Sequence, residues 1–166
     1  ENVFNSITKE MDGAKKPFLI HGVTSSGKTE IYMRLIEKVI KEGRQAIYLV
    51  PEIALTSQMV KFLRRRLSIE IAVLHSGMTQ SERRMTWQRI AEGSYPVVLG
   101  ARSAIFAPLE NLGLVIIDEE HETSYKQDNN PRFHAREVAK ERCRISGARL
   151  VLGSATPSVA SYYRAK

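Results

Sequence analysis

Short apolar runs alternate along this chain with longer segments in which apolar residues recur at helical spacing. Six runs are typical of buried strands, at residues 18–21, 46–50, 69–74, 96–99, 114–117 and 149–152. Strands that alternate with amphipathic helices form a mainly parallel sheet with helices on both faces. The pattern therefore predicts an α/β fold in one domain that covers residues 1–166.

The segments between the strands carry helix signals. Thr79 and Glu82 have the spacing of a capping box, and Gly93 is a suitable helix end. Helices are predicted in the first dozen residues and at about 31–40, 55–67, 79–93 and 134–145. The helix at 55–67 is expected to bury Met59, Phe62, Leu63 and Leu67. Residues 119–131, which include Asp-Asn-Asn-Pro, are predicted to form a long loop.

The composition fits a globular protein with one core. Cys143 is the only cysteine, and four scattered histidines offer no zinc-ligand spacing. No apolar run approaches the roughly 20 residues that span a bilayer, and the first residues lack the apolar region of a signal peptide. We therefore expect a cytoplasmic protein with no membrane partner. The net charge of +7 favours a polyanionic partner without identifying one.

The segment GVTSSGKT at residues 22–29 matches the phosphate-binding pattern G-x-x-x-x-G-K-[ST] between an apolar run and an amphipathic helix. Backbone N–H groups of such a loop surround the phosphates, and the helix directs its positive N-terminus at them. Lys28 is expected to bridge the β- and γ-phosphates, and the Thr29 hydroxyl to bind Mg²⁺. The residues assigned to the nucleotide are Gly22, Thr24, Ser25, Ser26, Gly27, Lys28, Thr29 and Glu30.

Two carboxylates follow a strongly apolar strand in the run LVIIDE at residues 114–119. The carboxyl end of a buried parallel strand is the expected place for ligands in an open α/β sheet. Asp118 would hold Mg²⁺ through its water shell, and Glu119 would position or deprotonate the attacking water. A solvated acidic turn is the alternative, and the phosphate-binding loop favours the catalytic interpretation.

Further motifs resemble those of superfamily 2 helicases. DEEH at 118–121 and GSATPS at 153–158 are similar to their DExH box and Ser-Ala-Thr motif. The ordered blocks GVTSSGKTE, LVPEIALTSQ, LHSGMTQSER, GARSAIFAP, IIDEEHETSYKQ and GSATPS, at 22–30, 49–58, 74–83, 100–108, 116–127 and 153–158, resemble the PriA family of bacterial replication-restart helicases. The resemblance implies a RecA-like P-loop NTPase fold. Ser25 departs from the family, which usually has glycine there.

The resemblance also assigns roles to individual residues. Lys28, Asp118, Glu119 and His121 would be catalytic, and His121 would relay the state of the nucleotide to Ser154, Ala155 and Thr156. The loop after DEEH resembles an aromatic-rich loop that couples DNA contact to ATP hydrolysis, and aromatic and basic side chains together suit single-stranded DNA. The expected DNA contacts are Pro51, Glu52, Arg102, Ser103, Tyr125, Lys126, Arg132 and Phe133.

The function implied is that of an ATP-dependent 3′ to 5′ DNA helicase in replication restart and primosome assembly. ATP and Mg²⁺ would be its cofactors, and forked and single-stranded DNA, the primosome and single-strand-binding proteins its partners. The chain would be a fragment with little turnover alone, and a DNA-binding region, a second lobe and a zinc segment would lie elsewhere. Two alternatives stay open: a duplex translocase of the same superfamily, of remodelling or restriction type, and a P-loop nucleotide-binding module without a nucleic-acid role.

Overall fold

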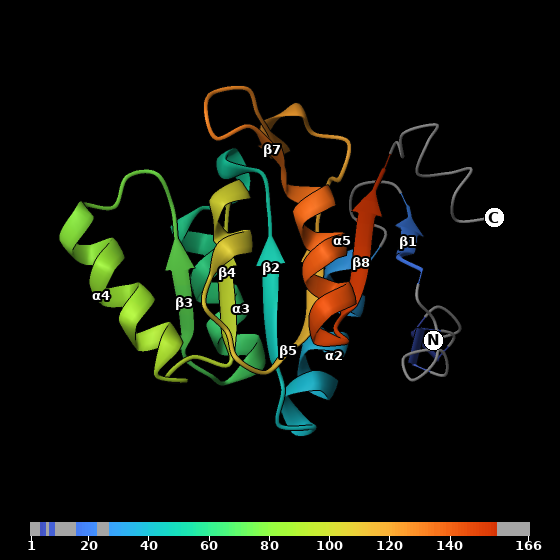
Figure 1. The fold of residues 1–166 in the computed structure, drawn as a ribbon. Coiled ribbons are helices and arrows are strands. Elements are labelled where there is room, and N and C mark those ends of the chain that lie inside the picture. The colour runs from blue at the N-terminus through green and yellow to red at the C-terminus, as the bar shows by residue number, and fades with distance from the viewer. Residues whose placement is uncertain (1–3, 6, 9–15, 23–26, 156–166) are drawn as a thin grey trace.

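A six-stranded, wholly parallel sheet organises the chain (Figure 1). The computed structural model describes residues 4–5, 7–8, 16–22 and 27–155. The sheet order is β1-β8-β5-β2-β4-β3. Its strands are β1 (Phe18–His21), β2 (Gln45–Leu49), β3 (Ile71–Leu74), β4 (Val97–Gly100), β5 (Leu112–Ile117) and β8 (Arg149–Ser154). The six predicted strands are confirmed, with boundaries shifted by a few residues at most.

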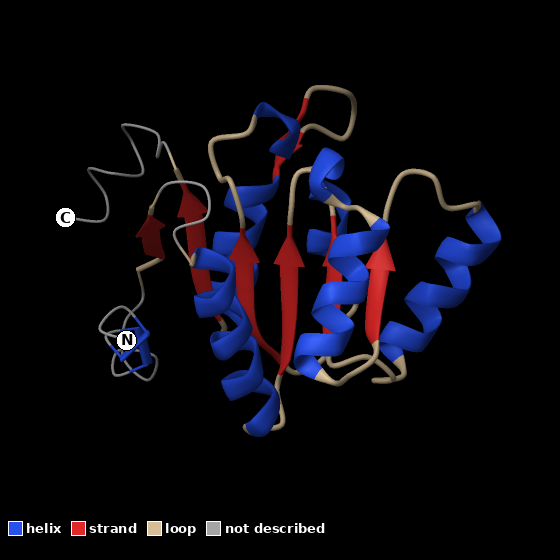
Figure 2. Cartoon of the chain, turned by 180° about the vertical axis from the view of Figure 1, so that it is seen from behind, coloured by secondary structure: helices blue, strands red, loops and turns tan. Residues whose placement is uncertain are grey.

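Two pairs of helices cover the two faces of the sheet, as the views from front and back show (Figures 1 and 2). The helices α2 (Lys28–Lys41) and α3 (Ser57–Leu67) pack on one face, and α4 (Gln80–Ala91) and α5 (Ala135–Ser146) on the other. Every residue of the central strand β5 is buried, because helices cover both of its faces. The predicted α/β architecture is confirmed.

Local signals define where the helices begin. Thr79 and Glu82 form the predicted capping box at the start of α4, with both reciprocal hydrogen bonds present. Thr56 accepts a hydrogen bond from the Met59 N–H at the start of α3. Helix α2 begins differently, because its N-cap residue is Gly27, which brings no capping side chain. The N-terminus of α2 is therefore available to a ligand.

Two sequence predictions were wrong. Phe62 was expected in the core, but 49% of it is exposed, because the apolar face of α3 is satisfied by Leu63 and Leu67. Residues 119–131 are not one irregular loop: they include the short helix η3 (Thr123–Tyr125) and the strand β6 (Lys126–Gln127). Strand β6 pairs in a hairpin with β7 (Phe133–His134), which lies just beyond this range. Strands of two residues are too short to produce a readable alternation. The helix predicted in the first dozen residues lies largely outside the described residues.

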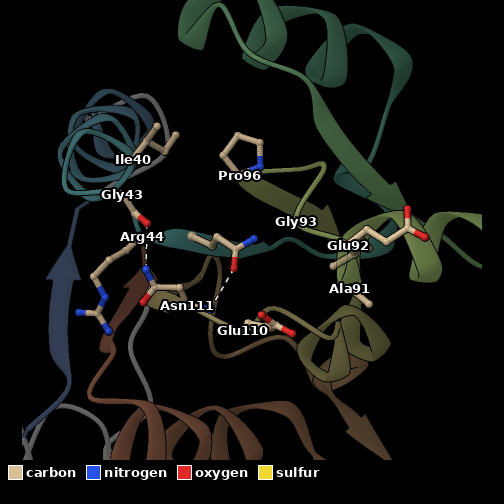
Figure 3. Close-up of a pocket in the computed structure, with 11 residues that line it drawn as sticks. Ile40, Gly43, Arg44, Ala91, Glu92, Gly93, Pro96, Glu110 and Asn111 are labelled. Carbon is tan, nitrogen blue, oxygen red and sulfur yellow. Dashed lines mark hydrogen bonds between the residues drawn. The ribbon is translucent and has the colours of Figure 1, made fainter.

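A shallow pocket of about 370 Å³ lies at the amino-terminal edge of the sheet (Figure 3). The Gln45 side chain accepts a hydrogen bond from the Asn111 N–H, and the Asn111 side chain donates to the Gly43 carbonyl. These contacts tie the start of β2 to the segment before β5. In the part of the chain that the structure describes, every helix is too short or too polar to cross a membrane.

Candidate nucleotide site and DNA-facing surface

The carboxyl ends of β1, β8 and β5 bring three sequence motifs together. His21 is in register with Ser154 across β1 and β8, and the Gly22 N–H donates to the Ser154 carbonyl over 3.2 Å. Strand β8 also pairs with β5, which ends directly before Asp118. The described ends of the phosphate-binding segment, the DExH box and the Ser-Ala-Thr motif are therefore neighbours, as ligand binding at the carboxyl edge of an α/β sheet requires.

The phosphate-binding segment leads into helix α2 through Gly27. Its φ of +85° is a left-handed conformation that favours glycine. Lys28 is only 7% exposed, and its ammonium group donates to the Gly22 carbonyl over 2.7 Å. Thr29 lies exposed in the first turn of α2. The predicted residues Thr24, Ser25 and Ser26 lie outside the described residues.

Lys28 also contacts the predicted catalytic carboxylate. Its ammonium group lies 3.3 Å from Glu119 Oε1, and Glu119 Oε2 accepts a hydrogen bond from the Ala155 N–H over 3.4 Å. Glu119 has a φ of +48°, a left-handed conformation that costs a residue with a side chain about 1–2 kcal/mol. Such strain is typical of functional positions, where surrounding contacts hold the backbone in place. In this conformation the Glu119 carboxylate contacts Lys28.

Asp118 lies at the tip of β5 in a largely desolvated position. Burial raises the pKa of its carboxyl group, and hydrogen bonds from the Tyr32 hydroxyl and the Glu119 N–H oppose that shift. Both donors reach the same oxygen, Oδ1, over 3.0 Å. The carboxylate is therefore held in one orientation by groups from two elements.

His121 connects the DExH box to the Ser-Ala-Thr motif. Its Nδ1 atom lies 2.7 Å from the Ser154 hydroxyl oxygen and 3.6 Å from Glu119 Oε2. Ser154 is completely buried, so its hydroxyl has a fixed place. A change at Glu119 can therefore reach β8 through a short chain of contacts. Ala155 adjoins this chain, and Thr156 lies outside the described residues.

The donors at this edge fit a magnesium-bound nucleotide. Carboxylate and hydroxyl oxygens, supplied here by Asp118 and Thr29, are the hard ligands that Mg²⁺ prefers. The uncapped N-terminus of α2 and the Lys28 ammonium group supply N–H donors and positive charge for phosphates. Within the described ranges no group of three His, Cys, Asp or Glu side chains could hold a metal alone. Mg²⁺ in such sites usually shares its ligands with phosphates and water.

Three predicted site residues lie where they do not suit their predicted contacts with the nucleotide or with DNA. Glu30 was assigned to the nucleotide, but its carboxylate forms ion pairs with Arg34 and Arg66 over 3.2 and 2.9 Å on the outside of α2 and α3. Pro51 was a predicted DNA contact and is buried at the start of the short helix η1 (Glu52–Ala54). Tyr125 was another, yet it is 1% exposed and its hydroxyl donates to the Asp118 carbonyl over 2.6 Å. Pro51 and Tyr125 are too enclosed to stack on a base.

The other predicted DNA contacts lie on accessible short elements. Arg102 begins the helix η2 (Arg102–Phe106), and its Nη1 donates to the carbonyls of Ser124 and Lys126 over 3.1 and 2.6 Å. Its guanidinium carbon lies 5.8 Å from the centre of the Phe133 ring. Arg102 therefore joins η2 to the hairpin.

The surface around Arg102 combines positive charge with aromatic rings. Lys126 is exposed and pairs with Asp128 over 2.8 Å, and Arg132 and Ser103 are also exposed. Glu52 is exposed on η1, where it accepts a hydrogen bond from the Ser76 N–H that lowers its pKa. We use the name aromatic hairpin surface for Arg102, Ser103, Phe106, Lys126, Arg132 and Phe133.

Sequence reasoning missed two residues of this edge. Phe106 packs edge-on against Phe133 with ring centres 5.0 Å apart, and 45% of it is exposed. Its position within GARSAIFAP was a usable signal, since aromatic residues in a track-lining block are candidates for stacking. Tyr32 is the other, and its place inside an amphipathic helix gave no signal that its hydroxyl would reach Asp118.

Comparisons with known proteins agree with this site. A family model described as DEAD/DEAH box helicase matches residues 1–164. The chain is 53% identical over 164 residues to the replication restart protein PriA of Bacillus subtilis (strain 168). The alignment covers 98% of this chain and 20% of the Bacillus protein. The chain is also 53% identical over 148 residues to PriA of Treponema pallidum (strain Nichols). That alignment covers 89% of this chain and 22% of the Treponema protein. The chain thus spans about a fifth of the length of these relatives.

A solved structure leads to the same conclusion. The structure of RecG bound to a three-way DNA junction is 26% identical, has a TM-score of 0.63, and matches 99% of this chain and 22% of that one. The predicted RecA-like fold and the predicted resemblance to the PriA family are confirmed. With the family match over nearly its whole length, the chain belongs to the DEAD/DEAH box helicase family.

Proposed function

We propose that this chain is the first RecA-like lobe, residues 1–166, of a longer ATP-dependent DNA helicase that acts in replication restart. The observation that carries the proposal is the carboxyl edge of the sheet, where Lys28, Asp118 and Glu119 lie together beside the aromatic hairpin surface. Relatives about five times its length, named for replication restart, support the longer protein and its process.

In this proposal the nucleotide phosphates replace the internal partners of Lys28. The Lys28 ammonium group would leave Glu119 and bind the β- and γ-phosphate oxygens, while the N-terminus of α2 donates its N–H groups. Thr29 and Asp118 would hold Mg²⁺, which neutralises charge on the phosphates when it is bound. Glu119, released from Lys28, would accept a proton from the attacking water at its carboxylate.

The same contacts supply a route between ATP and DNA. Release of Glu119 changes the surroundings of His121, which meets the Ser154 hydroxyl, and Tyr125 ties the backbone of Asp118 to the segment that begins the hairpin. DNA bound on the aromatic hairpin surface would therefore act on the backbone of the metal-binding residue. Movement in the 3′ to 5′ direction, primosome assembly and contact with single-strand-binding proteins are proposed from the resemblance to PriA.

Turnover by the isolated chain tests the one-lobe part of the proposal. We expect weak nucleotide binding and little hydrolysis, because charge in the transition state would lack an arginine from a second lobe. The measurement is the ATPase rate of the isolated chain with and without single-stranded DNA. Robust DNA-stimulated turnover by this chain alone would contradict the proposal.

Strand separation by the full-length protein distinguishes a helicase from a duplex translocase. Forked DNA with a labelled strand is expected to be separated in the presence of ATP and Mg²⁺, and Lys28→Ala is expected to abolish the reaction. A protein that hydrolyses ATP on duplex DNA without separating the strands would instead be a translocase. Loss of DNA-stimulated hydrolysis in Lys28→Ala would exclude the second alternative, a nucleotide-binding module with no nucleic-acid role.

A further inference from the structure

Three buried tyrosines from separate elements converge on Asp118. Tyr32 comes from α2, Tyr48 from β2 and Tyr125 from η3, and each is at most 1% exposed. The rings of Tyr32 and Tyr48 meet edge-on with centres 5.6 Å apart. A buried phenol needs a hydrogen-bond partner, and Asp118 is the group they share.

The contacts of Tyr32 and Tyr125 with Asp118 differ in kind. Tyr125 donates to the main-chain carbonyl, whereas Tyr32 donates to the carboxylate oxygen Oδ1 over 3.0 Å. Of these two hydrogen bonds, only that of Tyr32 can restrict rotation of the carboxylate, which the Tyr48 hydroxyl also contacts. Because Oδ1 also accepts the Glu119 N–H, two fixed donors occupy that oxygen and set the direction of the carboxylate.

Gly153 creates the space that this hydrogen bond needs. A Cβ atom at Gly153 would lie 1.6 Å from the Tyr32 hydroxyl oxygen, 2.8 Å from Cζ of the same ring and 3.1 Å from Asp118 Oδ1. A separation of 1.6 Å is impossible for atoms that are not bonded, so an alanine would expel the hydroxyl group. The glycine that opens GSATPS therefore serves the metal-binding carboxylate as well as its own strand.

We propose that Tyr32 is a positioning residue for magnesium binding, because its hydroxyl fixes Oδ1 of Asp118 and so orients the carboxylate for the metal and its water shell. Gly153 contributes by leaving space for the Tyr32 hydroxyl group. The inference rests on the proposed function, since it needs Asp118 to hold Mg²⁺. Held ligands bind a metal more strongly than mobile ones, because less freedom is lost when the metal arrives.

Nucleotide affinity with and without metal tests the proposal. Tyr32→Phe keeps the ring and removes the hydroxyl, and the readouts are binding of a fluorescent ADP analogue to the full-length protein in Mg²⁺ and in EDTA. We expect about tenfold weaker binding in Mg²⁺, as for loss of one hydrogen bond to a charged group, and unchanged binding in EDTA. Titration of Mn²⁺ by electron paramagnetic resonance in the presence of ADP is expected to show the same weakening.

Tyr95→Phe is the matched control, since it removes a hydroxyl group of equal size from a tyrosine outside this cluster, beside Arg89. We expect it to leave the difference between Mg²⁺ and EDTA intact. Equal effects of the two variants, or equal weakening by Tyr32→Phe in Mg²⁺ and EDTA, would overturn the proposal. Absence of any Mg²⁺ effect in the unmodified protein would instead contradict the proposed function.

Gly153→Ala tests the packing by a separate measurement. We expect the alanine to lower the melting temperature and to weaken binding in Mg²⁺. Adding Tyr32→Phe removes the 1.6 Å contact, so the double variant is expected to regain part of the lost melting temperature. A double variant that is no more stable than Gly153→Ala alone would show that the hydroxyl does not occupy this space.

Discussion

The nucleotide site and the aromatic hairpin surface share one edge of the sheet but are built in opposite ways. At the nucleotide site Lys28 and Ser154 are buried, and side-chain hydrogen bonds fix Lys28, Asp118 and His121. On the aromatic hairpin surface the rings are accessible, and Arg102 holds the segments together through backbone carbonyls. Catalysis needs prearranged groups, whereas stacking on a strand of any sequence needs open ring faces.

The contrast also separates the two arginine-rich parts of the chain. On α3, Arg66 pairs with Glu30 and Glu37, and Arg64 donates to the Ile71 carbonyl. These contacts serve the packing of α2, α3 and β3. Arg102 has comparable contacts but lies over the half-buried ring of Phe133, so its charge belongs to a surface that combines aromatic and basic groups and suits DNA.

The largest expected effect is at the nucleotide site. Glu119→Gln keeps the shape of the side chain and removes its ability to accept a proton, so the rate of ATP hydrolysis by the full-length protein should fall at least about 100-fold. Nucleotide affinity should not fall, because Lys28 loses a competing partner. Steady-state ATPase and equilibrium nucleotide binding measure the two quantities. Retained turnover would assign the proton transfer to another group.

A medium effect is expected from the aromatic hairpin surface. Phe133→Ala should weaken binding of single-stranded DNA about tenfold, within the range for loss of one stacked base. Phe62→Ala is the control for loss of an aromatic ring elsewhere, since Phe62 is exposed on α3 whereas Phe133 is half-buried. Fluorescence anisotropy with labelled oligonucleotides measures both affinities. Equal losses in the two variants would remove the distinction between the two surfaces.

Arg102 connects the two regions, and its substitution should have a smaller effect on coupling. We expect Arg102→Ala to reduce stimulation of the ATPase by DNA about fivefold, consistent with loss of about 1 kcal/mol. Arg102→Lys should be nearly as impaired, because an ammonium group lacks the planar guanidinium that lies over the Phe133 ring. Normal stimulation in Arg102→Lys would show that charge alone suffices. Arg65→Ala on α3 serves as the control.

The smallest effect concerns the end of the hairpin. Burial lowers the pKa of His134, whose Nδ1 accepts the Arg136 N–H at the start of α5. The folded protein therefore binds this proton less readily than the unfolded chain, so stability is greatest above about pH 6.5 and falls as the pH drops below that value. His134→Asn keeps a capping oxygen that does not titrate, and should flatten this dependence. Denaturant unfolding at several pH values measures it. If the free energy of unfolding depends on pH equally in the variant, groups other than His134 cause the pH dependence.

The fold and the nucleotide site were predictable because their signals lie within short segments. A buried strand needs a continuous apolar run, and a phosphate-binding loop needs glycines and a lysine at fixed spacing before a helix. Residues 114–119 and 22–29 could therefore be assigned from the sequence alone. The capping box of Thr79 and Glu82 is equally local. In these cases the residues that cause the local structure are close to one another in the sequence.

The remaining features depend on contacts between distant segments. Glu30 matched the end of a motif, but Arg66 on another helix determines where its carboxylate lies. Tyr125 stands in a polar loop, and its burial follows from a bond to Asp118 that no local pattern encodes. Phe62 has helical spacing like its buried neighbours, but Leu63 and Leu67 form the contact of α3 with the core and leave it exposed. In each case, contacts between segments that are distant in the sequence determine the position of the side chain.

The buried position of Cys143 offers a practical advantage for labelling. It is the chain's single cysteine, it is 7% exposed on α5, and burial raises the pKa of its thiol to about 12. Thiol reagents attack the thiolate, which this residue scarcely forms at neutral pH. A cysteine introduced at Asp128, in the exposed turn of the hairpin, would therefore react selectively with a fluorophore. Within this chain, motion of the hairpin during ATP binding could be followed without first removing the native thiol.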